Sequence, residues 1–170
     1  MADNSFTKLR NFLYLFFLLF IIWMVLTNTL QSAELITGIA ISLVLALVLN
    51  QNYQKLGLPP IGIKRIAYFV MFLLVLLKEI VKANFDVAYR VLHPKMPINP
   101  GIVIIKTGLK QDIAKMLLAN SITLTPGTFT LDIRDDELLI HWINVKAQSK
   151  ADSTRAIGER FEKYLQVVFA

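Results

Sequence analysis

Two long apolar runs occupy the N-terminal third of the chain. The first covers residues 12–26, and the uncharged residues 27–30 extend it to about the 20 residues that a helix needs to cross a bilayer. The second begins at Ala33 and ends near residue 50, and small residues such as Gly38 let another helix approach it closely. The pattern predicts a transmembrane helical hairpin within residues 1–65, with spans at about 12–30 and 33–50.

Basic residues flank these two runs but are absent from the connection between them. Lys8 and Arg10 precede the first run, the loop after the second contains Lys55, Lys64 and Arg65, and residues 28–34 contain neither Lys nor Arg. Because positive charge is retained on the cytoplasmic side, the pattern predicts a multi-pass protein with both termini in the cytoplasm. A signal peptide has a similar start, but no small-residue cleavage site follows here and a second apolar run comes at once.

A third helix is predicted over residues 66–92. Its first dozen residues are apolar, and from Lys78 onward polar residues recur every fourth position, at Lys78, Lys82, Asp86 and Arg90. This pattern is typical of a membrane-associated amphipathic helix, buried at first in lipid or against partner subunits and then lying along the headgroups. A third full span is the alternative, but it would place the C-terminal domain opposite the basic loop, so two spans are preferred.

The remaining residues predict a small cytoplasmic α+β domain. Residues 93–101 contain three prolines and form a stiff linker. Over residues 102–170 the alternation and helical spacing of apolar residues predict the order β-α-β-β-α. The expected elements are a strand at 102–105, a helix at 110–119, extended segments at 122–124 and 128–133, a strand at 138–145 and a helix at 152–169.

Composition narrows the classes of function. Hydrophobic residues make up 55% of the 170 residues, more than a soluble domain normally carries. The net charge of +6 is spread along the chain, which favours membrane lipids over nucleic acid as a partner. With no Cys and only two distant His residues, His93 and His141, neither a thiol nucleophile nor a metal site is expected, and no cofactor is predicted.

The most distinctive string runs from Asn120 to Thr128. Its simplest interpretation is a strand that ends in a type II turn, with Pro126 and Gly127 at the two central positions. The alternative is a turn whose hydroxyls and amides meet a partner or an ion. The string lacks the Gly-rich phosphate-loop pattern, so nucleotide binding is not expected. The candidate structural or partner-contact residues are Thr123, Thr125, Pro126, Gly127, Thr128 and, in the hairpin, Gly38.

Lys78 and Glu79 are the second candidate site, as charged residues near membrane depth that could belong to an ion pathway. Neighbouring residues on a helix point about 100° apart, so the two cannot share one coordination site. Snorkelling at the interface is the preferred interpretation. The sequence specifies no nucleophile with an orienting base, so we expect no catalytic residues and no enzyme activity.

The segments Asn120–Asp132 and Leu138–Val145, together with Lys78–Asn84, resemble the E subunit of the Mrp/Mnh multisubunit Na⁺/H⁺ antiporters, and the resemblance extends over nearly the whole chain. It implies an accessory, non-catalytic subunit of a bacterial plasma-membrane complex whose ion-translocating subunits are other polypeptides. Its partners would be those other antiporter subunits. The competing hypothesis is a free-standing membrane-anchored sensor whose C-terminal domain binds a small ligand.

Overall fold

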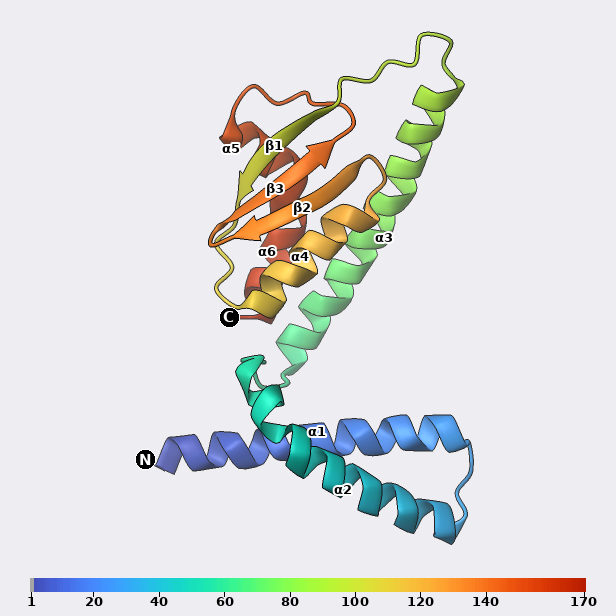
Figure 1. Cartoon of the computed structure of the whole chain (residues 1–170), viewed down its shortest axis with the longest axis vertical. Helices are drawn as coiled ribbons and strands as arrows, with labels where there is room; N and C mark the ends of the chain where they lie inside the picture. Colours follow the sequence, from blue (N-terminus) through green and yellow to red (C-terminus); the bar gives the residue numbers. More distant parts are fainter. Residues whose placement is uncertain (1) are drawn as a thin grey trace. The chain divides into compact units, whose positions relative to one another are not determined.

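A computed structural model describes residues 2–170, with side chains described from Phe6 onward (Figure 1). The chain divides between Leu58 and Pro59 into two compact units. The first contains two apolar helices, and the second contains a further long helix, a three-stranded sheet and the helices that cover it. The predicted fold class is therefore confirmed.

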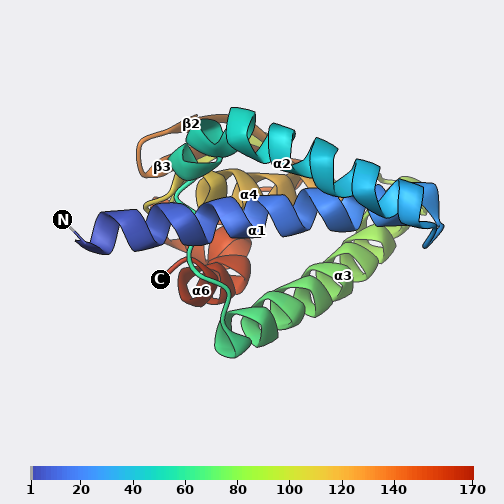
Figure 2. The same cartoon turned by 90° about the horizontal axis from the view of Figure 1, so that it is seen from below.

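The N-terminal unit is a hairpin of α1 (Ala2–Thr27) and α2 (Ser32–Lys55), which lie side by side (Figures 1 and 2). Small residues of α2 are buried at every fourth position, namely Gly38, Ser42 and Ala46, and form its stripe against α1. Both helices also expose many large apolar side chains. Both helices are long and apolar enough to cross a membrane, as the sequence predicts.

The C-terminal unit has the predicted β-α-β-β-α order after its first helix. Its elements are α3 (Ile63–Leu92), β1 (Gly101–Lys106), α4 (Asp112–Leu124), β2 (Thr128–Arg134), β3 (Glu137–Trp142), α5 (Lys150–Ser153), the π-helical turn η1 (Thr154–Gly158) and α6 (Glu159–Val168). The sheet has the order β1-β3-β2, and β3 pairs antiparallel with both neighbours. The β2–β3 turn contains Asp135 at φ +50° and lies between the predicted extended segment 128–133 and the predicted strand 138–145.

The core of this unit lies between one face of the sheet and the helices α4 and α6. Its fully buried side chains are Ile105, Leu118, Ile122, Leu138, Ile140, Ile157, Phe161 and Leu165. The strands alternate buried and exposed residues, as a sheet covered on one side requires.

Helix α3 is part of the same unit, because it packs along α6. Phe72 is fully buried, and its ring meets that of Phe161 edge to face at a centroid distance of 6.4 Å. Tyr68 and Tyr164 form a second aromatic contact at 6.5 Å. The sequence-based prediction separates residues 66–92 from the C-terminal domain as a membrane-associated segment. In the structure, one face of α3 packs against that domain.

The residues between α3 and β1 are also attached to the domain. The backbone N–H of Asn99 donates to Ile143 O at 3.1 Å, and that of Val145 donates to Asn99 O at 2.8 Å. The Pro-rich segment, predicted as a linker over 93–101, therefore runs beside the end of β3.

One predicted segment is wrong. Residues 122–124 are expected as extended chain but form the last turn of α4. Leu118 and Ile122 are one helical turn apart and both fully buried, so continuing the helix keeps Ile122 in the core. The helix stops at Thr125, because the residue before a proline is biased away from the helical conformation.

Candidate functional site

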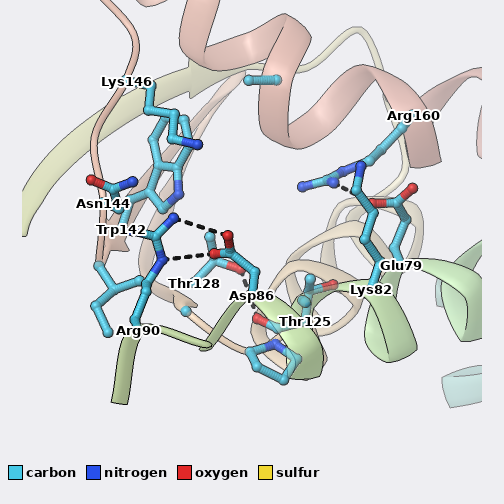
Figure 3. Close-up of a pocket in the computed structure, with 15 residues that line it drawn as sticks. Glu79, Lys82, Asp86, Arg90, Thr125, Thr128, Trp142, Asn144, Lys146 and Arg160 are labelled. Atoms are coloured by element: carbon cyan, nitrogen blue, oxygen red, sulfur yellow. Dashed lines mark hydrogen bonds and ion pairs between the residues drawn. The ribbon is translucent and has the colours of Figure 1, made fainter. Parts of the chain in front are cut away.

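A pocket of about 230 Å³ lies between α3, the α4–β2 turn and the residues that follow β3, all within the C-terminal unit. Its charged lining side chains are Glu79, Lys82, Asp86, Arg90, Lys146 and Arg160. Figure 3 shows Asp86 between two groups, with Arg90, Trp142 and Lys146 on one side and Glu79, Lys82 and Arg160 on the other. The structure thus brings together the two candidate sites of the sequence, because Thr125, Pro126, Gly127 and Thr128 line the same pocket as Glu79.

The turn has the predicted type II geometry. Thr128 N–H donates to Thr125 O at 3.2 Å, and Gly127 has φ +88°, a conformation that glycine adopts without steric cost. Gly127 O also accepts a hydrogen bond of 2.9 Å from Ile143 N–H, which ties the turn to the end of β3.

The hydroxyls of this segment are used within the domain. Thr125 Oγ1 donates to Ser121 O at 2.9 Å, and Thr128 Oγ1 lies 2.7 Å from Ile122 O. Thr123 does not line the pocket, and its Oγ1 accepts from Thr130 N–H at 3.1 Å. These contacts support the structural interpretation of the three hydroxyls, because each one fastens the end of α4 to itself or to β2.

Asp86 and Arg90 form a two-point ion pair on the pocket-facing side of α3. Arg90 Nε and Nη2 donate to the carboxylate of Asp86 at 2.8 and 2.9 Å, and Nη1 donates to Pro97 O at 2.5 Å. With its amide oxygen turned toward the guanidinium, Asn144 accepts two more bonds of 3.0 Å. The hydrogen bonds from Arg90 hold the pKa of the Asp86 carboxyl below its ordinary value.

Glu79 and Arg160 form a second ion pair, at 2.5 Å, which joins α3 to α6. The side chains are only 14% and 29% exposed, so the pair is mostly shielded from water. Lys78, its neighbour in sequence, is exposed and does not line the pocket. As expected from the helix geometry, the two residues do not share a site.

Lys82 and Lys146 are the remaining charges of the pocket. Both side chains are exposed, and neither forms a hydrogen bond or ion pair with another described residue. Both nevertheless act on Asp86, since each further lowers the pKa of its carboxyl through charge. With four cations and two anions the pocket has an excess of two positive charges, which suits it to hold an anion.

Gly38 lies in the other unit and takes no part in this pocket. A side-chain carbon built on it would come within 2.4 Å of Trp23 Cδ1. Trp23 Nε1 in turn donates to Glu34 O at 3.1 Å across the hairpin. The helix that Gly38 admits is therefore α1 of the same chain.

Sequence reasoning missed the contribution of Trp142, Asn144, Lys146 and Arg160, because these residues reach the pocket through tertiary packing. The described residues contain no group of three or more metal-ligating side chains. The pocket chemistry is that of ion pairs and hydrogen-bond donors rather than of an activated nucleophile.

Comparisons with known proteins identify the family. The family model MNHE, described as Na⁺/H⁺ ion antiporter subunit, matches residues 16–168. The E subunit of the Na⁺/H⁺ antiporter of Alkalihalophilus pseudofirmus is 32% identical over 143 residues, which cover 84% of this chain and 88% of that protein. The E1 subunit of the Na⁺/H⁺ antiporter of Staphylococcus aureus is 32% identical over 156 residues, covering 92% and 96%.

Among solved structures, a chain of the membrane-bound sulfane sulfur reductase, an archaeal respiratory membrane complex, is 48% identical with a TM-score of 0.81. The match covers 94% of this chain and 99% of that one. Family model, relatives and fold agree over nearly the whole length. The chain belongs to the MNHE family of Na⁺/H⁺ antiporter subunits.

Proposed function

We propose that this chain is a non-catalytic accessory subunit of a multisubunit Na⁺/H⁺ antiporter, and that it supports assembly and activity of the ion-translocating subunits. The observation that carries the proposal is the family match over residues 16–168. Two physical features of the chain support an accessory role rather than a direct part in ion transfer.

The first feature is the absence of charge from the centres of the spans. Residues 12–27 of α1 and 35–50 of α2 contain no Asp, Glu, Lys or Arg. A proton or Na⁺ path through a membrane is normally built from ionisable residues that face the protein interior. Ion transfer is therefore assigned to other subunits.

The second feature is the outer side of α3, which exposes large apolar residues along its length. They include Leu74, Leu77, Phe85, Tyr89, Val91 and Leu92. A 30-residue helix is about 45 Å long, and apolar surface of that extent requires cover by lipid or by another protein. We assign this side of α3 to the membrane and to the larger subunits.

The accessory role is tested in a strain that lacks the gene for this chain, with a plasmid copy as control. We expect the deletion to lower the amount of assembled complex on native gels. Antiport in everted vesicles should fall in proportion, with an unchanged apparent Na⁺ affinity of the remaining complex. A normal yield of complex with altered Na⁺ affinity would show instead that the chain takes part in transport.

A second candidate follows from the 48% identity to the respiratory complex chain, which exceeds the 32% identity to the antiporter subunits. In this case the chain would serve a comparable membrane module of a respiratory complex. Mass spectrometry of a mild-detergent pull-down separates the possibilities. Co-purified redox subunits would favour the respiratory complex. Large polytopic subunits without redox subunits would favour the antiporter, and the absence of any stable partner would favour the free-standing sensor.

The orientation proposed from the basic flanks places both termini and the C-terminal domain in the cytoplasm. A single cysteine placed near Gly101 or at the C-terminus should resist a membrane-impermeant reagent in intact cells, whereas Ser32→Cys, between the two spans, should react. The opposite labelling pattern would invert the topology.

A further inference from the structure

We propose that the pocket between α3, the α4–β2 turn and the end of β3 binds the phosphate of an anionic phospholipid headgroup, with Lys82 and Lys146 as its principal contacts. The proposal goes beyond the accessory role and does not depend on it, because it concerns a ligand of this chain alone.

The charges of the pocket are arranged so that two cations are left for a ligand. Arg90 is paired with Asp86 and Arg160 with Glu79, so each guanidinium is already neutralised. Lys82, from α3, and Lys146, from the segment after β3, line the same pocket and have no described partner. The two ammonium groups reach the pocket from separate segments, on either side of Asp86, and each can donate a charge-assisted hydrogen bond to a phosphate oxygen (Figure 3).

Trp142 adds a neutral donor beside them. Its indole lines the pocket, and its Nε1 donates to none of the described residues. Tryptophan is enriched where lipid headgroups meet the hydrocarbon region, because its ring is apolar and its N–H requires a partner. A lipid phosphate or glycerol oxygen would accept this hydrogen bond.

The surroundings of Lys82 favour a lipid over a free anion. Val81 and Phe85 are 48% and 74% exposed and belong to the apolar outer side of α3. A phospholipid satisfies both surfaces, with its phosphate in the pocket and its chains along α3. Free phosphate would use the basic pocket alone. Basic pockets beside membrane helices are known sites for anionic headgroups.

The test is lipid binding to the full chain in a neutral detergent, measured by native mass spectrometry with phosphatidylglycerol and with zwitterionic phosphatidylcholine. Each lysine near an anionic lipid changes affinity by about fivefold. The double variant Lys82→Gln/Lys146→Gln should therefore bind phosphatidylglycerol about twenty-five-fold more weakly. The matched control is Lys110→Gln/Lys115→Gln, which removes the same charge outside the pocket. The melting temperature of each variant checks that it is folded.

Selective binding of phosphatidylglycerol that is lost in the pocket variant and kept in the control supports the proposal. Equal binding of both lipids, or equal loss in the two double variants, overturns it. Inorganic phosphate, titrated by calorimetry, distinguishes the source of the anion, because tighter binding of free phosphate than of the lipid would assign the pocket to a soluble ligand. Binding of an acidic peptide in place of lipid would assign it to a partner protein.

Discussion

Gly127→Ala should destabilise the C-terminal unit more than a single added methyl group normally does. Gly127 is the third residue of the turn and has φ +88°. An alanine there would hold an L side chain in the left-handed region, at a cost of about 1–2 kcal/mol. Its Cβ would also lie 2.9 Å from Ile143 Cγ2 and 3.5 Å from Val87 Cγ2.

The second cost follows from those distances. A contact below 3.0 Å forces a neighbour to move, and overpacking of this kind typically costs about 1–3 kcal/mol. The two terms together give about 2–5 kcal/mol. At roughly 4 °C per kcal/mol for a unit of this size, the melting temperature should fall by about 8–20 °C.

Two other glycines separate these terms. Gly57 has φ +60° with nothing within 4 Å of an added Cβ, so Gly57→Ala carries only the backbone term. Gly62 has neither the positive φ nor a close neighbour, so Gly62→Ala should be nearly neutral. Thermal unfolding of the full chain in detergent, followed by circular dichroism so that both units are observed, provides the comparison. Wild-type melting of Gly127→Ala would refute the reasoning from turn geometry.

Three further predictions concern the hairpin and the ion pairs. Gly38→Leu should separate the two N-terminal helices and lower the yield of complex without preventing membrane insertion; efficient cross-linking of cysteines placed across the hairpin would contradict this. Glu79→Gln should lower the urea midpoint of the C-terminal unit, because it removes the partner of Arg160 at a cost of about 1–3 kcal/mol. Lys78→Gln is the control and should leave the midpoint unchanged. Equal midpoints would show that the pair contributes nothing to stability, and a shift in Na⁺ affinity per complex would assign Glu79 to transport. The lowered pKa of the Asp86 carboxyl implies that its ionisation stabilises the fold above the unfolded-state pKa of about 3.9, and that this stability is lost as the pH falls through the folded-state pKa. Asp86→Asn should therefore flatten this part of the acid unfolding curve. An unchanged curve would refute this prediction.

The parts of the fold that could be predicted depend on local pattern. The hairpin follows from two uncharged runs of sufficient length, and the β2–β3 turn follows from alternating residues on either side of Asp135. The type II turn follows from Pro126 and Gly127, whose conformational preferences are intrinsic. Each of these features is set by residues close together in the chain.

The parts that could not be predicted depend on contacts between distant residues. Local alternation at 122–124 suggests extended chain, but burial of Ile122 beside the sheet keeps this segment helical. The pocket requires Lys146 and Arg160 to meet α3, and nothing in local sequence indicates that meeting. The expected neighbour of Gly38 was likewise an unspecified helix, whereas the structure identifies Trp23 of the same chain.

Helix geometry, combined with the burial of two residues, explains which face of α3 meets the domain. A stripe of strictly every fourth residue rotates by about 40° at each step, so Lys78 points about 120° away from Arg90, whereas Glu79 points within about 20° of it. Phe72 lies five full turns before Arg90 and so points in the same direction. Phe72 and Arg90 are the two buried residues of α3. A buried aromatic ring and a buried arginine in one direction, with Glu79 between them, indicate packing against protein, because a headgroup-facing side would leave that arginine in water.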